Sequence, residues 1–374
     1  MAAKRRREVS HLIVENNEEK KELTLQQRLC KYCKIFTITS VILIIIVFIL
    51  AFVVLPLIFM NTVKWQEWLI FHNHNVTPQN PEFRYPEKYN MEAVENLYVT
   101  VDLSSHLSLG VWYILPEQLI SNGVTPEKDL NYTKVLFDEN FPVVLYLHET
   151  NGNRITPLNM YKVLRRFFHV ITIDYRSYGD SNEGNLSEVD IVKDVVFMYK
   201  WLKRRTNGEV FIWGHALGAA ISTRAIAELQ KEKIVPTGLF LEAGFTELKE
   251  LLLHNDIIKF FSWLPWFNAT VVDALEYNGF RFKTQEDVVE VNCPIMIVHA
   301  EDDHVVPYTM GEELFKTAQE KRNVTVQGSV SFYLFPGNLV YDHWRIYQAP
   351  ELPNYIENHI DVCREFHRVS EETT

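Results

Sequence analysis

The stretch Val210-Phe-Ile-Trp-Gly214-His-Ala216-Leu-Gly218-Ala-Ala220 decides the fold of this chain. Four apolar residues run into a Gly-x-Ala-x-Gly turn, and small residues follow it. The apolar run predicts a buried strand, and the residues up to about Lys231 predict a helix. Glycine tolerates sharp turns and close backbone contacts, so we predict a strand, a tight turn with Ala216 at its tip, and a helix.

In α/β-hydrolases a turn of this kind carries the reactive residue. The motif there is Gly-x-Ser-x-Gly, and its strained central serine exposes a hydroxyl. Ala216 occupies the nucleophile position here and has no hydroxyl. We therefore interpret the stretch as a nucleophile elbow without its nucleophile. An ordinary strand-to-helix turn is the alternative, because Gly-x-x-x-Gly alone is a weak pattern.

Short apolar runs alternate with helical segments on both sides of this turn. Two alternating segments at 96–103 and 108–115 predict an antiparallel pair of strands. Continuous apolar runs predict further strands at 142–148, 170–175, 210–213, 239–242 and 295–299, with helices at 158–167, 187–205 and 217–232 between them. Such alternation is typical of a mostly parallel sheet buried on both faces, so we predict an α/β domain of the α/β-hydrolase fold over 91–366.

An insertion at about 246–291 interrupts the alternation and is predicted to form a cap. It contains the aromatic run Phe260-Phe-Ser-Trp-Leu-Pro-Trp-Phe267. Aromatic density in an inserted segment indicates a lid or a membrane-facing patch, and the packed core of a cap explains it equally well. Residues 367–374 are predicted to be a short tail.

Residues 35–60 carry no charge and are almost wholly apolar. A stretch of this length can span a bilayer with some tilt, so we predict one transmembrane helix, followed by a connector at 61–90. A cleaved signal peptide fits less well, because the stretch is too long, starts too late and lacks a small-residue cleavage site.

The charge before this helix predicts its orientation. Residues 1–34 hold nine Lys and Arg against five Asp and Glu, which places this basic tail in the cytosol and the body in the lumen or outside. Five Asn-x-Ser/Thr sequons follow the helix and none precedes it, as this orientation requires. The candidate glycosylation sites are Asn75, Asn131, Asn185, Asn268 and Asn323.

The rest of the chain is acidic. It keeps 28 of the 37 basic and 43 of the 48 acidic residues, which argues against nucleic acid and against electrostatic adhesion to anionic lipid. Cys30 and Cys33 at the membrane edge are either lipidated or inert, and Cys293 and Cys363 could form a disulfide if they lie close together. No Cys/His cluster has zinc spacing, and we predict neither a metal nor a cofactor.

Two further motifs follow the elbow in the order acid, then histidine. The run from His299 to Pro307 places Asp303 just past a buried strand, where a carboxylate can orient an imidazole. Asp303 is preferred to Asp302 because its spacing to Val306-Pro307 fits the usual acid loop. His343 lies after a strand-like run at 331–335 and before a terminal helix, where the base histidine belongs.

With these motifs, residues 90–365 resemble the membrane-anchored α/β-hydrolase-domain lipases that hydrolyse lysophosphatidylserine and monoacylglycerol. The resemblance rests on these segments: Tyr146-Leu-His148 with Gly152 and Arg154, Asp174 to Ser181, Ile212 to His215, His299 to Asp303, and Ala349 to Pro353. It implies a single-pass anchor, a lumenal catalytic domain and residence in the endoplasmic reticulum membrane, with the plasma membrane as the alternative. It also implies a lysophospholipid or monoacylglycerol ligand.

The chain departs from this family at three active-site turns. Ala216 replaces the serine, His148-Glu149 replaces a His-Gly turn beside the oxyanion site, and Glu242-Ala-Gly-Phe-Thr246 replaces Glu-Ser-Pro-Phe-Thr. The oxyanion region should comprise Glu149 and Leu217. Loss of the serine alone costs on the order of a millionfold in turnover in such hydrolases. A carboxylate at Glu149 would oppose the negative charge that must develop there, unless it is turned away.

Three hypotheses follow from the sequence. The first is an anchored pseudoenzyme that keeps its pocket and works by binding lipid or protein. The second is an active lipid hydrolase in which Asp303 and His343 activate water, or in which another residue is the nucleophile. The third is an inactivated Ser-to-Ala form of an active lipase. The sequence itself names no ligand, oligomeric state or protein partner.

Overall fold

A computed structural model describes residues 25–74, 77–121, 131–138 and 141–372. The chain divides into two compact units, Met1–Ile58 and Phe59–Thr374, which are considered separately below. The basic run at residues 4–7 and the sequon at Asn75 lie outside the described residues.

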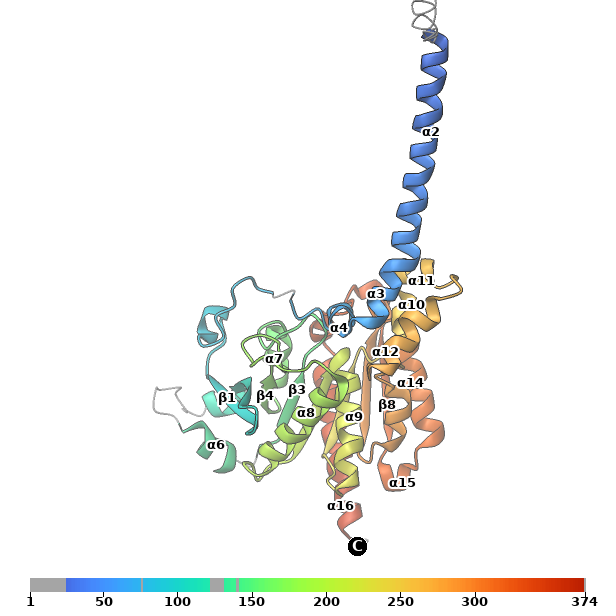
Figure 1. Cartoon of the computed structure of the whole chain (residues 1–374). Helices are drawn as coiled ribbons and strands as arrows, with labels where there is room; N and C mark the ends of the chain where they lie inside the picture. Colours follow the sequence, from blue (N-terminus) through green and yellow to red (C-terminus); the bar gives the residue numbers. More distant parts are fainter. Residues whose placement is uncertain (1–24, 75–76, 122–130, 139–140, 373–374) are drawn as a thin grey trace, which may run out of the picture. The chain divides into compact units, whose positions relative to one another are not determined.

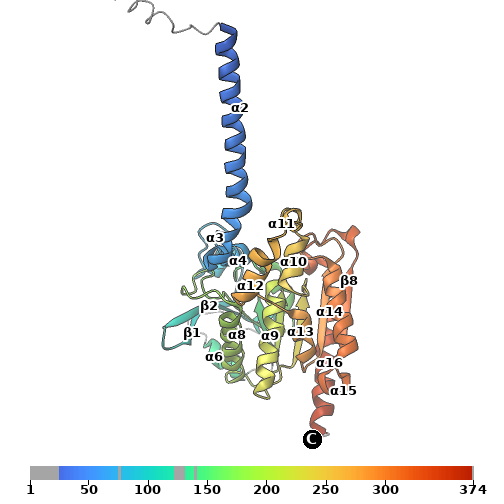
Figure 2. The same ribbon diagram turned by 45° about the vertical axis from the view of Figure 1, so that its right-hand side comes forward.

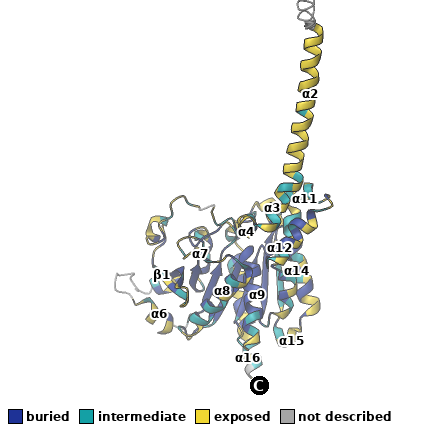
Figure 3. Cartoon of the chain, in the orientation of Figure 1, coloured by how far each residue is buried: buried dark blue, intermediate teal, exposed yellow. Residues whose placement is uncertain are grey.

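The described part of the first unit is helical. Helix α2 (Leu25–Ile49) continues through a π-helical turn, η1 (Leu50–Val54), into α3 (Leu55–Asn61), which extends into the second unit. Among the described residues one helical run, Gln26–Asn61, is long and apolar enough to cross a membrane, judged by length and composition. Its large apolar side chains are exposed in the structure (Figure 3). The apolar helix predicted at 35–60 lies within this run.

The second unit is built on an eight-stranded sheet in the order β1-β2-β4-β3-β5-β6-β7-β8. The β1–β2 and β2–β4 pairs are antiparallel, and all later pairs are parallel. The strands are β1 (Val94–Asp102), β2 (Leu107–Ile114), β3 (Val143–Leu147), β4 (His169–Ile173), β5 (Val210–His215), β6 (Gly238–Glu242), β7 (Ile295–Ala300) and β8 (Val330–Phe335). The predicted α/β fold with its mostly parallel sheet is therefore confirmed.

Helices cover both faces of the sheet (Figures 1 and 2). Successive strand residues point to opposite faces, so Ile212 packs in one apolar core and Phe211 and Trp213 pack in the other. Residues of α8 (Glu188–Lys203), α9 (Leu217–Lys231) and α14 (Tyr308–Lys321) fill the first core. Residues of α7 (Leu158–Leu164) and α16 (Leu352–Glu372) fill the second. Two-sided burial explains why the central strands are mostly apolar.

The predicted cap region between β6 and β7 forms short helices. They are α10 (Leu248–His254), α11 (Asp256–Phe261), η3 (Asn268–Val272), α12 (Asp273–Tyr277), α13 (Thr284–Asp287) and η4 (Val288–Glu290). The remaining short helices are α4 (Val63–Phe71), η2 (Pro86–Tyr89), α5 (Glu117–Ser121), α6 (Tyr132–Asp138), α15 (Val324–Gln327), η5 (Gly337–Leu339) and η6 (Ile346–Gln348).

Helix α4 packs into the second unit, although it falls in the segment predicted as a connector. Phe71 is completely buried, and its ring contacts Phe280 and Phe282 at centroid distances of 5.8 and 6.1 Å. The amide of Gln66 donates to the Phe59 carbonyl, 2.9 Å away. The division of the chain at residues 60, 90 and 366 stays a prediction, and the compact unit itself runs from Phe59 to Thr374.

The cysteines are all free in the structure. Cys30 and Cys33 are exposed on α2, whereas Cys293 and Cys363 are buried. Burial raises the pKa of the Cys293 thiol to about 12, so this thiol is neutral at physiological pH.

Candidate active site

The elbow is present as a strand, a turn and a helix. Strand β5 ends at His215, α9 begins at Leu217, and Ala216 between them has φ 49° and ψ −105°, a strained conformation for a residue with a side chain. A Cβ added at Gly214 would lie 2.3 Å from the Gly218 oxygen, and one at Gly218 would lie 2.2 Å from the Leu147 oxygen. The backbone segments approach each other so closely here that only glycine fits at these two positions.

The structure brings Asp303 and His343 into contact. Asp303 follows β7, and its Oδ2 lies 2.7 Å from His343 Nδ1. Its other oxygen accepts hydrogen bonds of 2.8 Å from the backbone amides of Val305 and Val306. Asp302 instead accepts from the amide of Asp342 at 3.1 Å. Of the two acids, Asp303 is the one placed to orient the imidazole.

This pair is poised for base chemistry. Burial alone would raise the pKa of Asp303, but its hydrogen bonds with His299 and His343 outweigh burial and hold the pKa well below its usual range. Burial alone would lower the pKa of His343, but the hydrogen bond to Asp303 and that carboxylate's charge outweigh it, so the pKa is raised. His343 Nε2 is buried and has no hydrogen-bond partner in the described part of the chain. In a hydrolase, this nitrogen takes the proton of the nucleophile.

Two further histidines support the pair, although no role was predicted for either of them. His299 Nε2 lies 2.9 Å from the Val306 oxygen and 3.3 Å from Asp303 Oδ2. His215 Nε2 lies 3.0 Å from the His343 oxygen, and the rings of these two histidines lie 4.7 Å apart. Burial holds the pKa of His215 well below its ordinary value, so a neutral ring fixes the His343 backbone. The position of His215 beside Ala216 was the available signal.

Two carboxyl groups line a cavity of about 70 Å³ beside the elbow. Glu149 Oε2 accepts from the Asn151 amide at 2.8 Å, and Glu242 Oε2 accepts from Trp213 Nε1 at 2.8 Å. Burial raises the pKa of both groups, that of Glu242 to about 7. The other lining residues are Tyr146, Thr156, Pro157, Asn159, Met160, His215, Trp344 and Tyr347. The cavity is well below the roughly 300 Å³ at which ligand pockets usually begin.

The predicted oxyanion region lies where α9 packs on the end of β3. The close approach of Gly218 to the Leu147 and His148 oxygens places Leu217 next to the loop that carries Glu149. The pKa of Glu149 is raised by burial and lowered in part by the nearby His343 and His72. The Glu149 carboxyl is therefore close enough to His343 for their charges to interact. Within the described ranges, no group of three or more His, Cys, Asp or Glu side chains is placed to hold a metal ion.

Comparison with known proteins places this chain in a family. No family model matches the chain. The lysophosphatidylserine lipase ABHD12 of Danio rerio is 32% identical over 311 residues, which cover 82% of this chain and 80% of that protein. ABHD12 of Rattus norvegicus is 32% identical, covering 78% and 73% of the two chains, and the human protein ABHD12B is 30% identical, covering 76% and 77%. This chain belongs to the ABHD12 family. The predicted resemblance is therefore confirmed.

Solved structures that resemble this ABHD12 relative share its fold. The esterase Pf2001 of Pyrococcus furiosus matches with a TM-score of 0.51 and 16% identity, over 74% of this chain and 92% of that one. The protein lip1 of Acinetobacter baumannii AYE matches with a TM-score of 0.50 and 14% identity, over 76% and 97%. These likenesses extend to the α/β-hydrolase fold alone.

In this ABHD12-family chain a buried arginine ties together the loops after β3 and β4. The Arg154 side chain is fully buried and pairs with Asp174 and, at 2.7 Å, with Asp180. It also donates to Asn96 at 2.9 Å and stacks over the Phe83 ring at 4.1 Å. Because a buried ion pair costs stability when one partner is lost, these contacts hold the loop between Glu149 and Arg154 in place.

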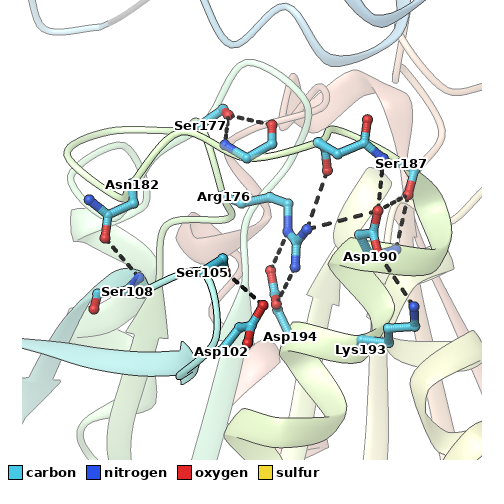
Figure 4. Close-up of polar contacts among 12 residues, drawn as sticks. Asp102, Ser105, Ser108, Arg176, Ser177, Asn182, Ser187, Asp190, Lys193 and Asp194 are labelled. Atoms are coloured by element: carbon cyan, nitrogen blue, oxygen red, sulfur yellow. Dashed lines mark hydrogen bonds and ion pairs between the residues drawn. The ribbon is translucent and has the colours of Figure 1, made fainter.

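A second arginine ties the loop after β4 to the start of α8 (Figure 4). Arg176 donates to both oxygens of Asp194, at 2.7 and 2.6 Å. Ser187 caps α8 by accepting from the Asp190 amide at 3.1 Å. Asn185, in the preceding sequon, donates to Asp190 at 2.8 Å. Asn131, Asn185, Asn268 and Asn323 are all exposed, as a glycan would require.

Proposed function

We propose that this protein is a membrane-anchored pseudoenzyme that binds a lysophospholipid or a monoacylglycerol without hydrolysing it. The supporting observation is the state of the triad. Asp303 and His343 keep a hydrogen bond of 2.7 Å, while His343 Nε2 has no partner among the described residues and the elbow carries a methyl group at Ala216. The machinery around the nucleophile is kept and the nucleophile is not.

The choice of ligand rests on the family. The relatives of Danio rerio and Rattus norvegicus are lysophosphatidylserine lipases, and this chain has a glycine elbow and an acid–histidine pair. The cavity of about 70 Å³ is too small for such a lipid. Binding therefore requires the residues that line the cavity to move apart. Trp344, which lines the cavity and is 45% exposed, is the lining residue whose displacement would widen it toward solvent.

The proposal is tested with purified wild-type protein and His343→Ala. Both should bind lysophosphatidylserine or monoacylglycerol, measured by calorimetry, and both should hydrolyse these lipids only at the background rate. Host serine hydrolases are first blocked with a fluorophosphonate, which does not act on a chain without an activated serine. If neither lipid binds, the proposal that the protein binds a lysophospholipid or a monoacylglycerol is wrong.

The second candidate is a hydrolase in which His343 activates water directly. The unpartnered Nε2 favours it, because a histidine held by a carboxylate can take a proton from water as readily as from a hydroxyl. Wild-type turnover at rates of roughly 1 to 1,000 per second, abolished by His343→Ala, would establish this candidate in place of the pseudoenzyme.

We also propose that the run Gln26–Asn61 anchors the protein in the endoplasmic reticulum membrane, with a cytosolic amino terminus and a lumenal body. The basic tail and the four exposed sequon asparagines support this orientation. In sealed microsomes the body should resist protease and its mass should fall after glycosidase treatment. Digestion of the body without a glycan shift would contradict the topology, and fractionation with the plasma membrane would correct the compartment.

A further inference from the structure

One end of the second unit exposes large apolar side chains on two short helices. Trp65 and Trp68 stand three residues apart on α4, and Ile257 and Phe260 stand three apart on α11, so each pair shares a helix face. Trp263 follows α11 closely and is 71% exposed, and Phe260 is 66% exposed. We call these five residues the aromatic face. Large apolar side chains that are exposed together at one end of a unit mark a surface that contacts something other than water.

The two helices belong to the same end of the unit. Asn278, at the end of α12, donates to Gln66 of α4 at 2.7 Å, and α10, α11 and α12 pack around a small shared cavity. Both views show α4, α10 and α11 at this end (Figures 1 and 2). It is also the carboxyl end of the parallel strands, because His72, just after α4, lies 3.1 Å from Asn151 in the loop that follows β3.

The short connection between the apolar helix and α4 indicates which surface the aromatic face contacts. The apolar run ends at Asn61 and α4 begins at Val63, two residues later. Two residues of extended chain span at most about 7 Å, so α4 stays beside the bilayer surface whatever the angle of the preceding helix. Tryptophan prefers the boundary between lipid head groups and acyl chains, where its apolar ring and its N–H are both accommodated.

We propose that the aromatic face inserts into the surface of the bilayer that the chain's own apolar helix spans. The inference rests on the anchoring proposed above. The net negative charge of the body disfavours anionic lipid, so the surface concerned is zwitterionic and the contact is apolar. Docking in this way turns the carboxyl ends of the strands, and the cavity beside Ala216, toward the membrane, so a lipid ligand can reach the site without crossing water.

Tryptophan fluorescence tests the proposal on the full chain. The eight tryptophans all lie outside residues 35–60, so quenching by lipid reports on the body alone. The protein is placed, one copy per disc, in nanodiscs of phosphatidylcholine brominated near the head of its acyl chains. Trp263→Phe should remove roughly a third of the quenchable emission, since three tryptophans form the face. Trp68→Phe should remove a similar share.

Trp201→Phe is the matched control. Helix α8 starts after the carboxyl end of β4 and runs back along the sheet, so Trp201 in its last turn lies toward the opposite end. Its substitution should leave the quenchable emission unchanged. Because Trp263 is exposed, Trp263→Phe should not alter the melting temperature, which excludes unfolding as the cause.

The outcomes separate this inference from the anchoring itself. Protein that resists alkaline extraction from membranes but shows no loss of quenching with Trp263→Phe would overturn the docking proposal and leave a protein partner as the occupant. Protein released by alkaline extraction would overturn the anchor, and the docking proposal with it. Loss with Trp263→Phe and Trp68→Phe but not with Trp201→Phe supports the bilayer as the partner.

Discussion

Ala216→Ser is expected to make this protein react covalently with a fluorophosphonate probe that the wild-type chain ignores. The new hydroxyl would stand at a turn already held at φ 49° by the elbow glycines. His343 Nε2, which is buried and has no partner in the described structure, would gain this hydroxyl as its partner. Asp303 already orients the ring from the other side at 2.7 Å. The base and its orienting acid therefore need no rearrangement.

The pH dependence identifies the base. Only the neutral imidazole can take the proton from a serine, and the pKa of His343 is raised above its ordinary value of 6.5. Labelling of Ala216→Ser should therefore increase as the pH rises through a pKa above 6.5. It should vanish in Ala216→Ser/His343→Ala, which keeps the serine. Labelling that survives this double substitution, or wild-type labelling at another residue, would show that the nucleophile lies elsewhere.

Replacing Glu149 in the Ala216→Ser background is expected to increase lipid turnover further. A donor that stabilises the oxyanion contributes about 100-fold to 1,000-fold in turnover, and a carboxylate beside that position opposes the same charge. Ala216→Ser alone should therefore hydrolyse lysophosphatidylserine slowly, and Ala216→Ser/Glu149→Gly should gain a factor of this order. Steady-state rates for the two variants provide the measurement.

Glu149→Gln in the same background is the control for charge. Glutamine keeps the length of the side chain and can still accept from the Asn151 amide, which Glu149 does now at 2.8 Å. Equal gains with Gly and Gln would attribute the effect to charge, and a gain with Gly alone would attribute it to bulk. No gain with either would contradict the role given to Glu149. Full turnover with Ala216→Ser alone would do the same, and would favour an inactivated form of an active lipase.

The elbow and the sheet could be predicted because their signals are local. At Gly214 and Gly218 a Cβ atom would collide with backbone atoms. The requirement for glycine is therefore visible in the five residues from Gly214 to Gly218. The central strands carry apolar residues on both faces, which a sheet covered on both sides requires. Asp303 could be selected over Asp302 because the following backbone amides fold onto it within three residues.

The rest of the site depends on contacts across the chain. His215 supports His343 from 128 positions away, so its place beside Ala216 suggests a role at the elbow but does not identify His343 as its partner. Several separate segments line the cavity, so the sequence could place Glu242 at an active-site turn but could not show that its carboxyl group lines the cavity beside Glu149. Helix α4 was not predicted from the sequence, for a different reason. Its buried residues include the polar Gln66 and Glu67, so no apolar period marks it.

Helix α4 also limits where the chain can be cut to obtain a water-soluble fragment. A fragment that starts at residue 91, where the strands begin, loses Phe71 from between Phe280 and Phe282. It also removes the carbonyl that accepts from the buried hydroxyl of Tyr178, and the ring of His72 that contacts Asn151. Such a fragment would lack part of its own core and one support of the loop beside Glu149. A fragment that keeps the native core has to begin before Val63, and its start then lies only a few residues after the apolar helix.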